Sequence, residues 1–547
     1  MIPLFVAINA KFIHTNNAVR LLKANSTHES EFMEFTIKDD VETMAKTILK
    51  QEPLFIGIST YIWNVKIVRK LVEVLKARSH TPVILGGPEV SYDAAHFLNT
   101  VPVDLIVKGE GEAVIDRIIS HYIEGTDLRQ LSNIAFRTED GAILETPINE
   151  IADLSKIRSP HRFKKDQSDF DNRIQYVESS RGCPFNCTYC LSSLEMKVRF
   201  FPLKDVQSDL LYLLENGAKT IKFLDRTFNA NKDAKAIIDY LIEHRTPDVV
   251  FQFEITGEIM DESLIDHIHA HAPKHLFRFE IGIQSTNDLT NRLVRRHQDN
   301  AKLFHLISKI RQADIIDMHL DLIAGLPEES LERFKKTFND VFKLGSRELQ
   351  LGFLKFLRGT RIRREADRFG YDFDTNAPYT IHRSAVLSPE DLNTIEDVET
   401  ALNLFHNKRY FGDVLFPILR DHFEDHFSMF KIMHDTYVKE GNPLKGYQMD
   451  TIYAFMERFL RHHFVPEHTL DELKLAYLRR SKVKPKCYFN TIKDKELKGT
   501  IFSDLAEKEG VPIADLYKHS VVTPLKDGYA IALYKSHTAT LFTLKHE

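Results

Sequence analysis

The chain has 547 residues, a formal net charge of −5 and a hydrophobic content of 43%. This length exceeds what one hydrophobic core supports, so we expect several domains. The net charge gives no general attraction to nucleic acid, and no run of about eighteen apolar residues predicts a transmembrane helix. Four cysteines in so long a chain exclude a disulfide framework and favour the reducing cytoplasm.

Residues 1–145 alternate short apolar runs with helical segments. The first run is IPLFVAINA, which lacks the basic lead of a signal peptide and is predicted to be a strand. The runs are rich in Ile, Val, Leu and Phe, which is typical of strands buried on both faces. Strand–helix alternation predicts a Rossmann-like, doubly wound parallel sheet that binds ligands beyond the C-terminal ends of its strands.

Residues 146–172 are polar and irregular, and we interpret them as a linker. From 173 to 370 the alternation resumes with six predicted strands, which indicates an open, partial (βα)6 barrel of the TIM type. Residues 371–547 read as a mostly helical C-terminal domain with β-strands at its end and Asp527-Gly528 as a turn. No motif in this last region predicts chemistry.

The segment RGCPFNCTYC gathers three of the four cysteines directly after the first predicted barrel strand. Cys183, Cys187 and Cys190 follow the spacing C-x3-C-x2-C. Three thiolates on a short loop can hold three corners of a cuboidal iron–sulfur cluster and leave one iron open, because protein clusters usually have four cysteine ligands. The alternatives are a zinc site with a distant histidine, or cysteines of the core. Zinc ribbons favour paired C-x2-C units, and this chain has one.

This motif, with an aromatic residue before the last cysteine, resembles the signature of radical S-adenosylmethionine (SAM) enzymes. The resemblance implies a [4Fe–4S] cluster whose open iron binds SAM. It also implies reductive cleavage of SAM to methionine and a 5′-deoxyadenosyl radical, with the protein supplying position and exclusion. An electron donor such as flavodoxin or ferredoxin is implied as a partner.

Polar residues at the C-terminal ends of the later barrel strands support the resemblance, because this fold class builds its site there. Motifs such as FLDRTFN, FEITGEI and FEIGIQS supply them. The resemblance implies that the SAM pocket includes Tyr189, Asp225, Glu254, Glu280, Gln284, Ser285 and Arg295. Arg296 is the alternative to Arg295, and a strand-capping or ion-pair role is the alternative for each residue.

The doubly wound domain before the barrel resembles the cobalamin-binding (B12-binding) subgroup of this family, including members with a C-terminal domain of unknown function. The resemblance implies that cobalamin contacts Ser59, Thr60, Trp63, Gly86, Gly87 and Glu110. Packing between domains is the alternative for Trp63, and a plain turn after the strand is the alternative for the glycine pair. The D-x-H-x-x-G motif of proteins that ligate cobalt through histidine is absent, so we interpret His14 as a loop or surface residue. The glycine pair would let backbone approach a bulky cofactor.

The cysteine count limits the enzyme class further. Methylthiotransferases need three more cysteines in the N-terminal domain, and this domain has none. Cys487 is interpreted as a bystander, with a reactive thiol as the alternative. We therefore predict a cobalamin-dependent radical SAM enzyme that methylates an unactivated carbon. The alternatives are a radical rearrangement or cyclisation without methyl transfer, and a metal-bearing binding module without turnover.

Other signals are discounted. His422 and His426 are four residues apart and would share one face of a helix, but no third zinc ligand is evident. The basic run at 478–486 is interpreted as a solvated face, so no clear nucleic-acid signal remains. We expect a cytoplasmic protein with no membrane partner.

Overall fold

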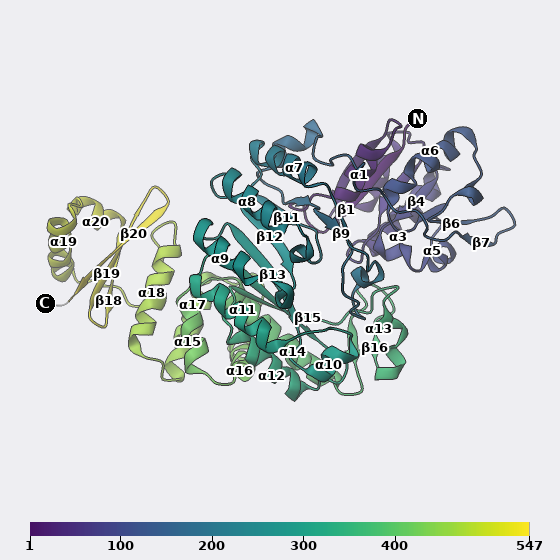
Figure 1. Cartoon of the computed structure of the whole chain (residues 1–547). Coiled ribbons are helices and arrows are strands. Elements are labelled where there is room, and N and C mark those ends of the chain that lie inside the picture. Colours follow the sequence, from purple (N-terminus) through teal and green to yellow (C-terminus); the bar gives the residue numbers. More distant parts are fainter. Residues whose placement is uncertain (546–547) are drawn as a thin grey trace. The chain divides into compact units, whose positions relative to one another are not determined.

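The computed structural model describes residues 1–545, which divide into two compact units. The first comprises Met1–Arg333 and Leu351–Pro389 and holds an N-terminal sheet followed by a second sheet (Figure 1). The second comprises Phe334–Gln350 and the chain from Glu390 onward. No helix in the described residues has the length and apolar content needed to cross a lipid bilayer.

The N-terminal sheet has seven strands in the order β2-β1-β3-β4-β5-β6-β7. Their bounds are β1 Leu4–Asn9, β2 Glu31–Thr36, β3 Ile56–Ser59, β4 Val83–Gly86, β5 Leu105–Val107, β6 Ile134–Arg137 and β7 Ile143–Glu145. The first five are parallel, as predicted. Because β1 lies between β2 and β3, the order reverses at β1 and β3, which is where doubly wound sheets bind ligands.

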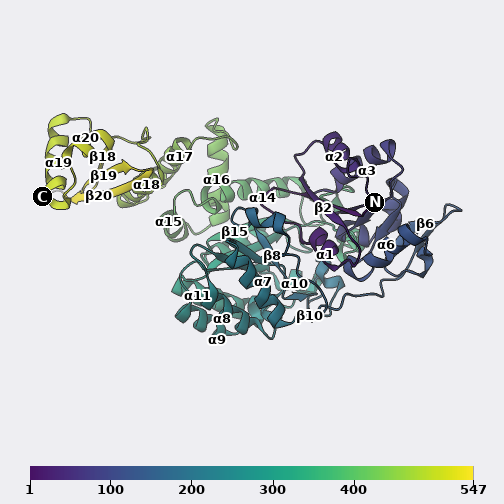
Figure 2. The same cartoon turned by 90° about the horizontal axis from the view of Figure 1, so that it is seen from above.

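Helices cover both faces of this sheet (Figure 2). They are α1 Asn17–Asn25, α2 Val41–Leu49, α3 Val65–Arg78, α4 Pro88–Ser91, α5 Ala94–Thr100 and α6 Ile115–Glu124. Residues of α1 and α6 form one core with the sheet, including Val19, Ile115 and Ile118. β1 is buried along its whole length, which explains its continuous apolar run.

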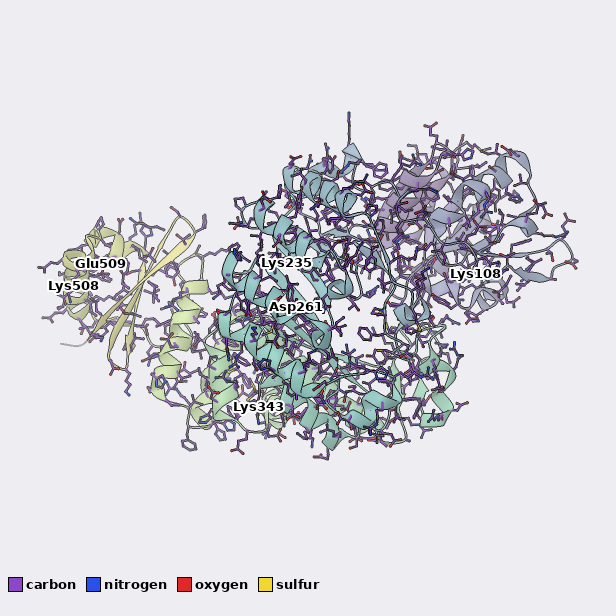
Figure 3. The ribbon with its side chains drawn as sticks, viewed as in Figure 1. Lys108, Lys235, Asp261, Lys343, Lys508 and Glu509 are labelled. Carbon is purple, nitrogen blue, oxygen red and sulfur yellow. The ribbon has the colours of Figure 1, made fainter. Side chains whose placement is uncertain are left out.

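Strands β6 and β7 form an antiparallel hairpin that the sequence analysis did not separate from the parallel strands. Lys108, which is labelled in Figure 3, directly follows β5. Its ammonium group bonds to Glu145 of β7 at 3.0 Å and holds the hairpin at the edge of the sheet. The sheet is therefore mixed rather than wholly parallel, as is common when an α/β sheet carries an antiparallel edge.

The second sheet has six strands in the order β15-β14-β13-β12-β11-β8, so its first and last strands do not meet and the barrel is open, as predicted. The strands are β8 Gln175–Val177, β11 Thr220–Phe223, β12 Val250–Ile255, β13 Phe277–Gln284, β14 Asp317–Ala324 and β15 Glu348–Phe353. The helices between them are α7 Leu203–Glu215, α8 Ala234–His244, α9 Glu262–His271, α10 Asp288–Leu293, α11 Asn300–Ala313 and α12 Leu331–Phe342.

Burial alternates along the central barrel strands, so one face of the sheet is apolar and the other is polar. In β13, each phenylalanine and isoleucine is buried, whereas Arg278, Glu280 and Gln284 are partly exposed. The parallel register places Glu254 of β12 directly beside Glu280 of β13. Successive side chains of a strand point to opposite faces, so the polar set collects on the concave side of the barrel.

The segment expected to be a linker, 146–172, is packed rather than loose. It contains a short 3-10 helix at Lys164–Asp169. Asp166 of this helix accepts two hydrogen bonds from Arg20 of α1, both at 2.8 Å, and both side chains are largely buried. The segment is therefore fixed to the N-terminal domain. After β15 come α13 Arg361–Arg364, β16 Asp372–Phe373 and β17 Ile381–Arg383.

The second unit is mostly helical and ends in a three-stranded antiparallel sheet, as predicted. Its elements are α14 Pro389–Leu402, α15 Leu415–His422, α16 His426–Lys439, α17 Met449–His462, α18 Glu467–Arg480, α19 Lys495–Glu509, α20 Ile513–His519, β18 Ser520–Leu525, β19 Gly528–Lys535 and β20 Thr538–Lys545. Most of α12 belongs to this unit, because Phe338 and Phe342 pack against Phe430 of α16.

Candidate functional site

The cysteine segment lies between two short strands, β9 Ser180–Arg181 and β10 Arg199–Phe200. Gly182 has φ +92°, and a Cβ there would collide with a backbone carbonyl, so glycine is required before the first cysteine. The N–H of Cys183 donates to the Glu195 carbonyl at 3.1 Å. These contacts fix where the cysteine loop begins.

The three sulfur atoms are free thiols in a mostly buried setting. Cys183 and Cys187 are buried and Cys190 is partly buried. The Cys183 Sγ lies 3.6 Å from the hydroxyl of Thr227. Burial raises the pKa of the Cys187 thiol, and the positive charge of Arg296 opposes this shift.

The three sulfur atoms are not grouped as tightly as the ligands of a single zinc ion. Sulfur atoms bound 2.3 Å from one tetrahedral zinc ion lie about 3.8 Å apart. Within residues 1–545, the one trio of histidine, cysteine or carboxylate ligands whose atoms all lie within 4.8 Å is Asp397, His434 and Asp435, so the cysteines do not form such a trio. Three more widely spaced thiolates suit three corners of an iron–sulfur cluster.

Two predicted glutamates lie on the concave face of the barrel in a charged group. The Nζ atom of Lys222 is 2.7 Å from Glu280 and 3.9 Å from Glu254. Arg226 contacts both carboxylate oxygens of Glu254 at 3.5 Å, the outer limit of a hydrogen bond. The side chain of Arg226 is 53% exposed. This arginine therefore has donors that can bind a ligand.

Two other predicted residues are used within the protein. Asp225 is buried and accepts hydrogen bonds from Ser179, through its N–H and its hydroxyl, and from the hydroxyl of Ser180. Burial raises the pKa of Asp225 to about 6 against these hydrogen bonds. Ser285 is also buried, and its hydroxyl donates to Glu329 at 2.6 Å. The strand-capping alternative considered above describes both residues.

The structure separates the two neighbouring arginines. Arg295 has φ +57° and an exposed side chain. Arg296 is partly buried and bonds through Nε to Gln298 at 2.7 Å. Its positive charge acts on the Cys187 thiol and lowers the pKa of that thiol against the effect of burial. Arg296 is therefore the arginine that the fold directs toward the cysteine loop.

Gln284 ends β13 in an unusual conformation. It has φ +67°, and its Oε1 atom is buried without a hydrogen-bond partner. A Cβ on Gly282 would collide with the Gln284 amide, so the glycine leaves room for this side chain. A buried acceptor without a partner is costly unless a ligand satisfies it. Gln284 therefore keeps its place among the candidate ligand-binding residues.

The predicted cobalamin residues lie at the C-terminal edge of the N-terminal sheet. Trp63 is 47% exposed and stacks on Tyr61 with ring centroids 4.3 Å apart. A Cβ on Gly86 would meet only Val107, at 3.8 Å, so packing within the protein does not require glycine there. The bare backbone at Gly86 borders open space that a flat ligand can approach.

Gly87 and Thr60 have internal roles. Gly87 has φ +106°, and a Cβ there would lie 2.6 Å from the Thr60 carbonyl. Thr60 is fully buried, and its N–H donates to the Gly86 carbonyl at 2.7 Å. The second glycine is therefore required by the close approach of two backbone segments, whereas Gly86 is not.

Glu110 joins the N-terminal domain to the barrel. It bonds to Arg181 at 3.2 Å and to Arg199 at 2.5 Å, and it accepts the N–H of Ala152 at 2.8 Å. Burial alone would raise the pKa of Glu110, but Arg199 and Arg181 hold it below its usual value. Arg181 also bonds to Glu112 at 2.8 Å. This largely buried cluster fixes the two domains of the first unit against each other.

A cavity of about 840 Å³ lies where these two domains meet. Both sets of candidate residues line it, from the N-terminal strand ends and from the barrel: Ser59, Trp63, Gly86, Gly87, Glu110, Arg181, Lys222, Arg226 and Glu254. Leu191, next to the last cysteine, also lines it. The remaining predicted residues lie outside the lining: Thr60, Cys183, Cys187, Tyr189, Cys190, Asp225, Glu280, Gln284, Ser285 and Arg295.

The sequence analysis did not single out Lys222, Tyr61 or Arg226 as site residues. Arg226 lies between Asp225 and Thr227 in FLDRTFN, the same strand-end motif that drew attention to its neighbour. The alternation of side chains along a strand does not continue into the loop after it, so the motif located the loop but not the residue that reaches the cavity.

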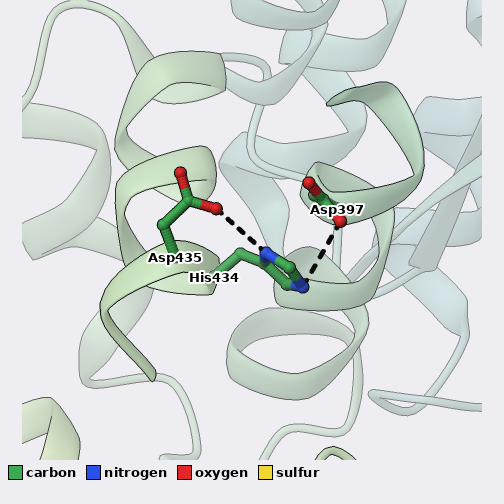
Figure 4. A group of neighbouring side chains, drawn as sticks. All are labelled: Asp397, His434 and Asp435. Atoms are coloured by element: carbon green, nitrogen blue, oxygen red, sulfur yellow. Dashed lines mark hydrogen bonds and ion pairs between the residues drawn. The ribbon is translucent and has the colours of Figure 1, made fainter. Parts of the chain in front are cut away.

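Asp397, His434 and Asp435 lie together in the second unit (Figure 4). The imidazole contacts Asp435 at 3.2 Å and Asp397 at 3.5 Å. Lys431 already lies 2.6 Å from Asp435 and 3.4 Å from Asp397. Because this ammonium group supplies a positive charge to both carboxylates, the group is an ion-pair network.

Two signals from the sequence are resolved in the second unit. The expectation that His422 and His426 share one helix face is wrong, because α15 ends at His422 and α16 begins at His426. Asp425 caps the second helix by accepting from the N–H of Ser428, which ends the first helix early. Burial raises the pKa of Cys487 to about 11, so it is a protonated thiol at neutral pH.

Sequence profiles of three families match most of the chain. The radical SAM superfamily matches residues 177–341 and the B12 binding domain matches residues 3–119. A protein family of unknown function, DUF4080, matches residues 367–520. The first two matches cover the domains that form the cavity.

Curated relatives match parts of this chain at low identity. An uncharacterized methyltransferase of Pyrococcus horikoshii is 24% identical over 58% of this chain and 70% of its own. The cobalamin-dependent radical SAM methyltransferase TokK of Streptomyces tokunonensis is 22% identical over 56% of this chain and 47% of its own. The anaerobic magnesium-protoporphyrin IX monomethyl ester cyclase of a Synechocystis species is 25% identical over 48% and 54%. This chain thus spans about half the length of the last two.

Solved structures share the fold. The cobalamin-dependent S-adenosylmethionine radical enzyme OxsB aligns with a TM-score of 0.63 and 14% identity, over 87% of this chain and 84% of its own. The radical SAM methyltransferase TsrM of Kitasatospora setae aligns with a TM-score of 0.59 and 17% identity, over 71% and 82%. These alignments show a common architecture of the N-terminal sheet and the partial barrel.

Proposed function

This chain belongs to the radical SAM enzymes that carry a B12-binding domain, and from that premise we propose that it methylates an unactivated carbon. The cofactors of this family are a [4Fe–4S] cluster, SAM and cobalamin. When bound, the cluster and SAM supply a 5′-deoxyadenosyl radical that abstracts hydrogen, and cobalamin supplies the methyl group. The substrate that accepts the methyl group must therefore contact the B12-binding domain and the barrel at the same time.

One observation carries the proposal. A single cavity of about 840 Å³ is bordered by the strand ends of the B12-binding domain and by the barrel residues beside the cysteine loop. Cys183, Cys187 and Cys190 would hold the cluster, and their buried, spaced thiols suit it. An acceptor in this cavity would lie between the source of the radical and the source of the methyl group.

The N-terminal wall suits a large flat ligand. The cavity continues between the sheet and helices α1 and α6, where it is bordered by Phe5, Leu22, Ile84, Val107 and Ile115. This apolar extension gives room for part of a ligand to insert beside β1, where the strand order reverses. The bare backbone at the C-terminal end of β4 and the stacked aromatic pair would bind the corrin plane.

The barrel wall suits charged ligand groups. Lys222 and Glu254 would orient the amino and carboxylate groups of SAM or of the acceptor. Arg226, with unused donors in the cavity, would bind a carboxylate or phosphate of a ligand. The ion pairs around Arg181 hold this wall against the N-terminal domain and restrict water entry from that side.

A second outcome of the same chemistry is a radical rearrangement or cyclisation without methyl transfer. The relative named as an anaerobic magnesium-protoporphyrin IX monomethyl ester cyclase supports this alternative, because it is 25% identical over 48% of this chain. A non-catalytic binding module is the third candidate. All three predict metal binding, and they differ in SAM cleavage and in methyl transfer.

The test is anaerobic purification with cobalamin supplied, followed by measurement of iron, sulfide and cobalt per chain. The reduced protein is then assayed for 5′-deoxyadenosine, with reduced flavodoxin or ferredoxin as electron donor. About four irons, one corrinoid and production of 5′-deoxyadenosine support the proposal. Iron without corrinoid favours the alternative without methyl transfer, and zinc in place of iron contradicts both enzymatic readings.

Variants assign the metal site in the same experiment. Cys183→Ala, Cys187→Ala and Cys190→Ala are each expected to lose the cluster and all SAM cleavage. Cys487→Ala is the matched control, because this protonated thiol lies in the second unit. It is expected to keep wild-type iron content, and a loss of iron there would contradict the assignment of the three-cysteine loop.

A further inference from the structure

The short helix α4 has one face in the cavity and another face bonded to the segment that follows β15. Pro88, Ser91 and Tyr92 line the cavity, directly after the glycine pair of the proposed corrin wall. Glu89 of the same helix is buried and does not line the cavity. Its carboxylate accepts a hydrogen bond from the hydroxyl of Tyr379, whose side chain is also buried. The position of this part of the wall therefore depends on contacts made behind it.

Arg358 lies at the centre of these contacts. Its Nε atom donates to the Tyr379 hydroxyl at 2.8 Å and lies 3.6 Å from Glu89. Another nitrogen of the same guanidinium donates to Asp93, the residue directly before α5. The arginine side chain is only 7% exposed, and a charge so deeply buried depends on its partners. The guanidinium therefore holds α4, the start of α5 and Tyr379 together.

The residues after Arg358 connect α4 to the cysteine loop. We call residues 356–364 the strap. Gly359 of the strap has φ +84°, and a Cβ there would lie 2.6 Å from the Cβ of Tyr92, so glycine allows the strap to approach the cavity wall closely. Three residues later, the N–H of Ile362 donates to the carbonyl of Thr188 at 2.9 Å. Thr188 lies between the second and third cysteines, so one short segment contacts both proposed cofactor sites.

His96 of α5 completes this group as an acceptor. Its Nε2 atom lies 3.1 Å from a nitrogen of Arg69 in α3 and 3.3 Å from a nitrogen of Arg358. Guanidinium groups can only donate, so this ring nitrogen has a lone pair and the imidazole is neutral. Burial and the charge of Arg358 lower the pKa of His96. Asp93 opposes this shift, whereas Arg69 and Arg363 of α13 act in the same direction as Arg358.

We propose that Arg358 is a positioning residue for the corrinoid, and that it fixes α4 only while His96 is neutral. The inference rests on the proposed function, because it places the corrinoid against the wall that α4 completes. A proton on His96 would put an N–H between two guanidinium groups and remove the acceptor that both use. Three cations would then repel one another, and the contact between α5 and the strap would open. Because α4 lies directly before α5, it would lose its fixed position.

Corrinoid binding should therefore weaken as the pH falls. The ordinary pKa of histidine is 6.5, and the closed cluster lowers it, so the closed form holds the proton less tightly than the open form. The closed form is fully favoured above the ordinary pKa and loses this advantage as the pH falls below it. One coupled proton changes a binding constant by at most about tenfold per pH unit, so the affinity for methylcobalamin should be about five- to tenfold weaker at pH ~5.5 than at pH ~7.5.

Variants separate the titrating group from the clamp. His96→Gln keeps a neutral acceptor for both arginines and cannot take up a proton, so its affinity should be the same at both pH values. Arg358→Met removes the clamp and should weaken binding about tenfold at the higher pH, with no further loss at the lower pH. Arg358→Lys keeps the charge and should recover part of the affinity. His80→Gln, at an exposed position before β4, is the matched control and should keep the wild-type pH dependence.

The experiment is equilibrium dialysis of the reconstituted full-length protein against methylcobalamin in dim light, at both pH values. A pH dependence in the wild type and in His80→Gln that disappears in His96→Gln supports the inference. The same pH dependence in His96→Gln overturns it, because another group then titrates. Iron is measured in the same samples. A loss of iron in parallel with corrinoid also overturns the inference, because it indicates general unfolding rather than release of α4.

Failure of this inference can be distinguished from failure of the proposed function. If the wild type binds no corrinoid at the higher pH, the proposed function fails and the inference fails with it. If the wild type binds corrinoid equally at both pH values, the function stands and only the positioning role fails. Should Arg358→Met not fold, His96→Gln still decides the question, because it leaves every charge of the cluster in place.

Discussion

The two walls of the cavity are built differently. The N-terminal wall consists of glycine backbone, a stacked aromatic pair and apolar side chains beneath α1 and α6. The barrel wall is charged, with Lys222, Arg226 and Glu254 facing the same space, and it lies beside the cysteine loop. One wall selects a ligand by shape, and the other holds charge and places reactive groups.

The difference teaches how one cavity can serve two cofactors. A flat, bulky ligand gains from contact area and needs small residues where it approaches the backbone. A charged ligand gains from fixed ion pairs that keep their orientation in a low-dielectric site. Substitutions on one wall should therefore change corrinoid binding without changing iron content, and substitutions on the other wall should do the reverse.

The largest expected effect on stability comes from removing Arg181, whose ion pairs hold the two walls of the cavity together. Arg181→Met leaves three largely buried carboxylates, Glu110, Glu112 and Glu178, without their shared cation. Removing one partner of a buried ion pair costs about 3–5 kcal/mol, so the melting temperature should fall by roughly 5–10 °C in calorimetry. Glu112→Gln, which removes one partner and keeps the arginine, should cost about 1 kcal/mol. Equal losses in both variants would contradict this account.

The second prediction concerns the pH dependence of stability in the barrel, behind its charged wall. The pKa of Asp225 is about 6 in the folded protein, whereas the ordinary pKa of an aspartate, which applies to the unfolded chain, is 3.8. The folded state therefore holds the proton more tightly. Stability should therefore fall by roughly 2–3 kcal/mol as pH rises from about 4 to 6 and then level off. Asp225→Asn should be less stable overall and lack this slope. Urea unfolding across the pH range measures it, and an unchanged slope in the variant argues against this residue.

The third prediction tests the N-terminal wall alone. Gly86→Leu extends a side chain from the C-terminal end of β4 into the cavity, where the structure leaves room for its Cβ. Corrinoid affinity should fall about tenfold or more through overpacking, whereas iron content stays at the wild-type level. Corrinoid retained after gel filtration measures the effect. Gly87→Ala is the contrasting variant, because its strained backbone predicts lower stability before any effect on ligand.

The smallest expected effect also falls on this wall. Trp63→Ala removes half of the stacked pair with Tyr61 at a position that is 47% exposed. The loss should be about 0.5–1.5 kcal/mol, which lowers corrinoid affinity by roughly 2–10-fold. Trp63→Phe should recover most of it. Titration of corrinoid by absorbance distinguishes the variants. Equal corrinoid affinities in the wild type and in Trp63→Ala would show that this side chain does not bind the corrinoid.

The sequence was most informative where structure follows from local patterns. The buried strands of the N-terminal sheet, the six barrel strands and the helical C-terminal region all follow from apolar periodicity, which depends on near neighbours in the chain. The sequence analysis did not predict the β6–β7 hairpin, because its strands are short and lie at the edge of the sheet. The sequence analysis also missed the break between the helices of His422 and His426. Asp425 caps the second helix there, and this cap competes with continuation of the first helix.

The candidate site shows the same division. The spacing of the cysteines predicts residues 183, 187 and 190 as the metal ligands, and the fold class predicts a site at the strand ends. The choice between Arg295 and Arg296 depended on a positive φ at the first, which turns its side chain outward. Likewise, Asp225 bonds to Ser179 and Ser180, and Ser285 bonds to Glu329. These partners are distant in the sequence, so the sequence could not predict that Asp225 and Ser285 are buried.

The sequence by itself determined the class of chemistry, because three cysteines at one spacing and the order of strands and helices are properties of the chain. The tertiary structure decided which side chains share a cavity. That outcome depends on contacts between residues far apart in sequence, such as Glu110 with Arg199, and on the direction in which each loop turns after its strand. The local sequence pattern specifies the helices and strands, whereas tertiary packing decides which side chains become neighbours. A binding site consists of such neighbouring side chains.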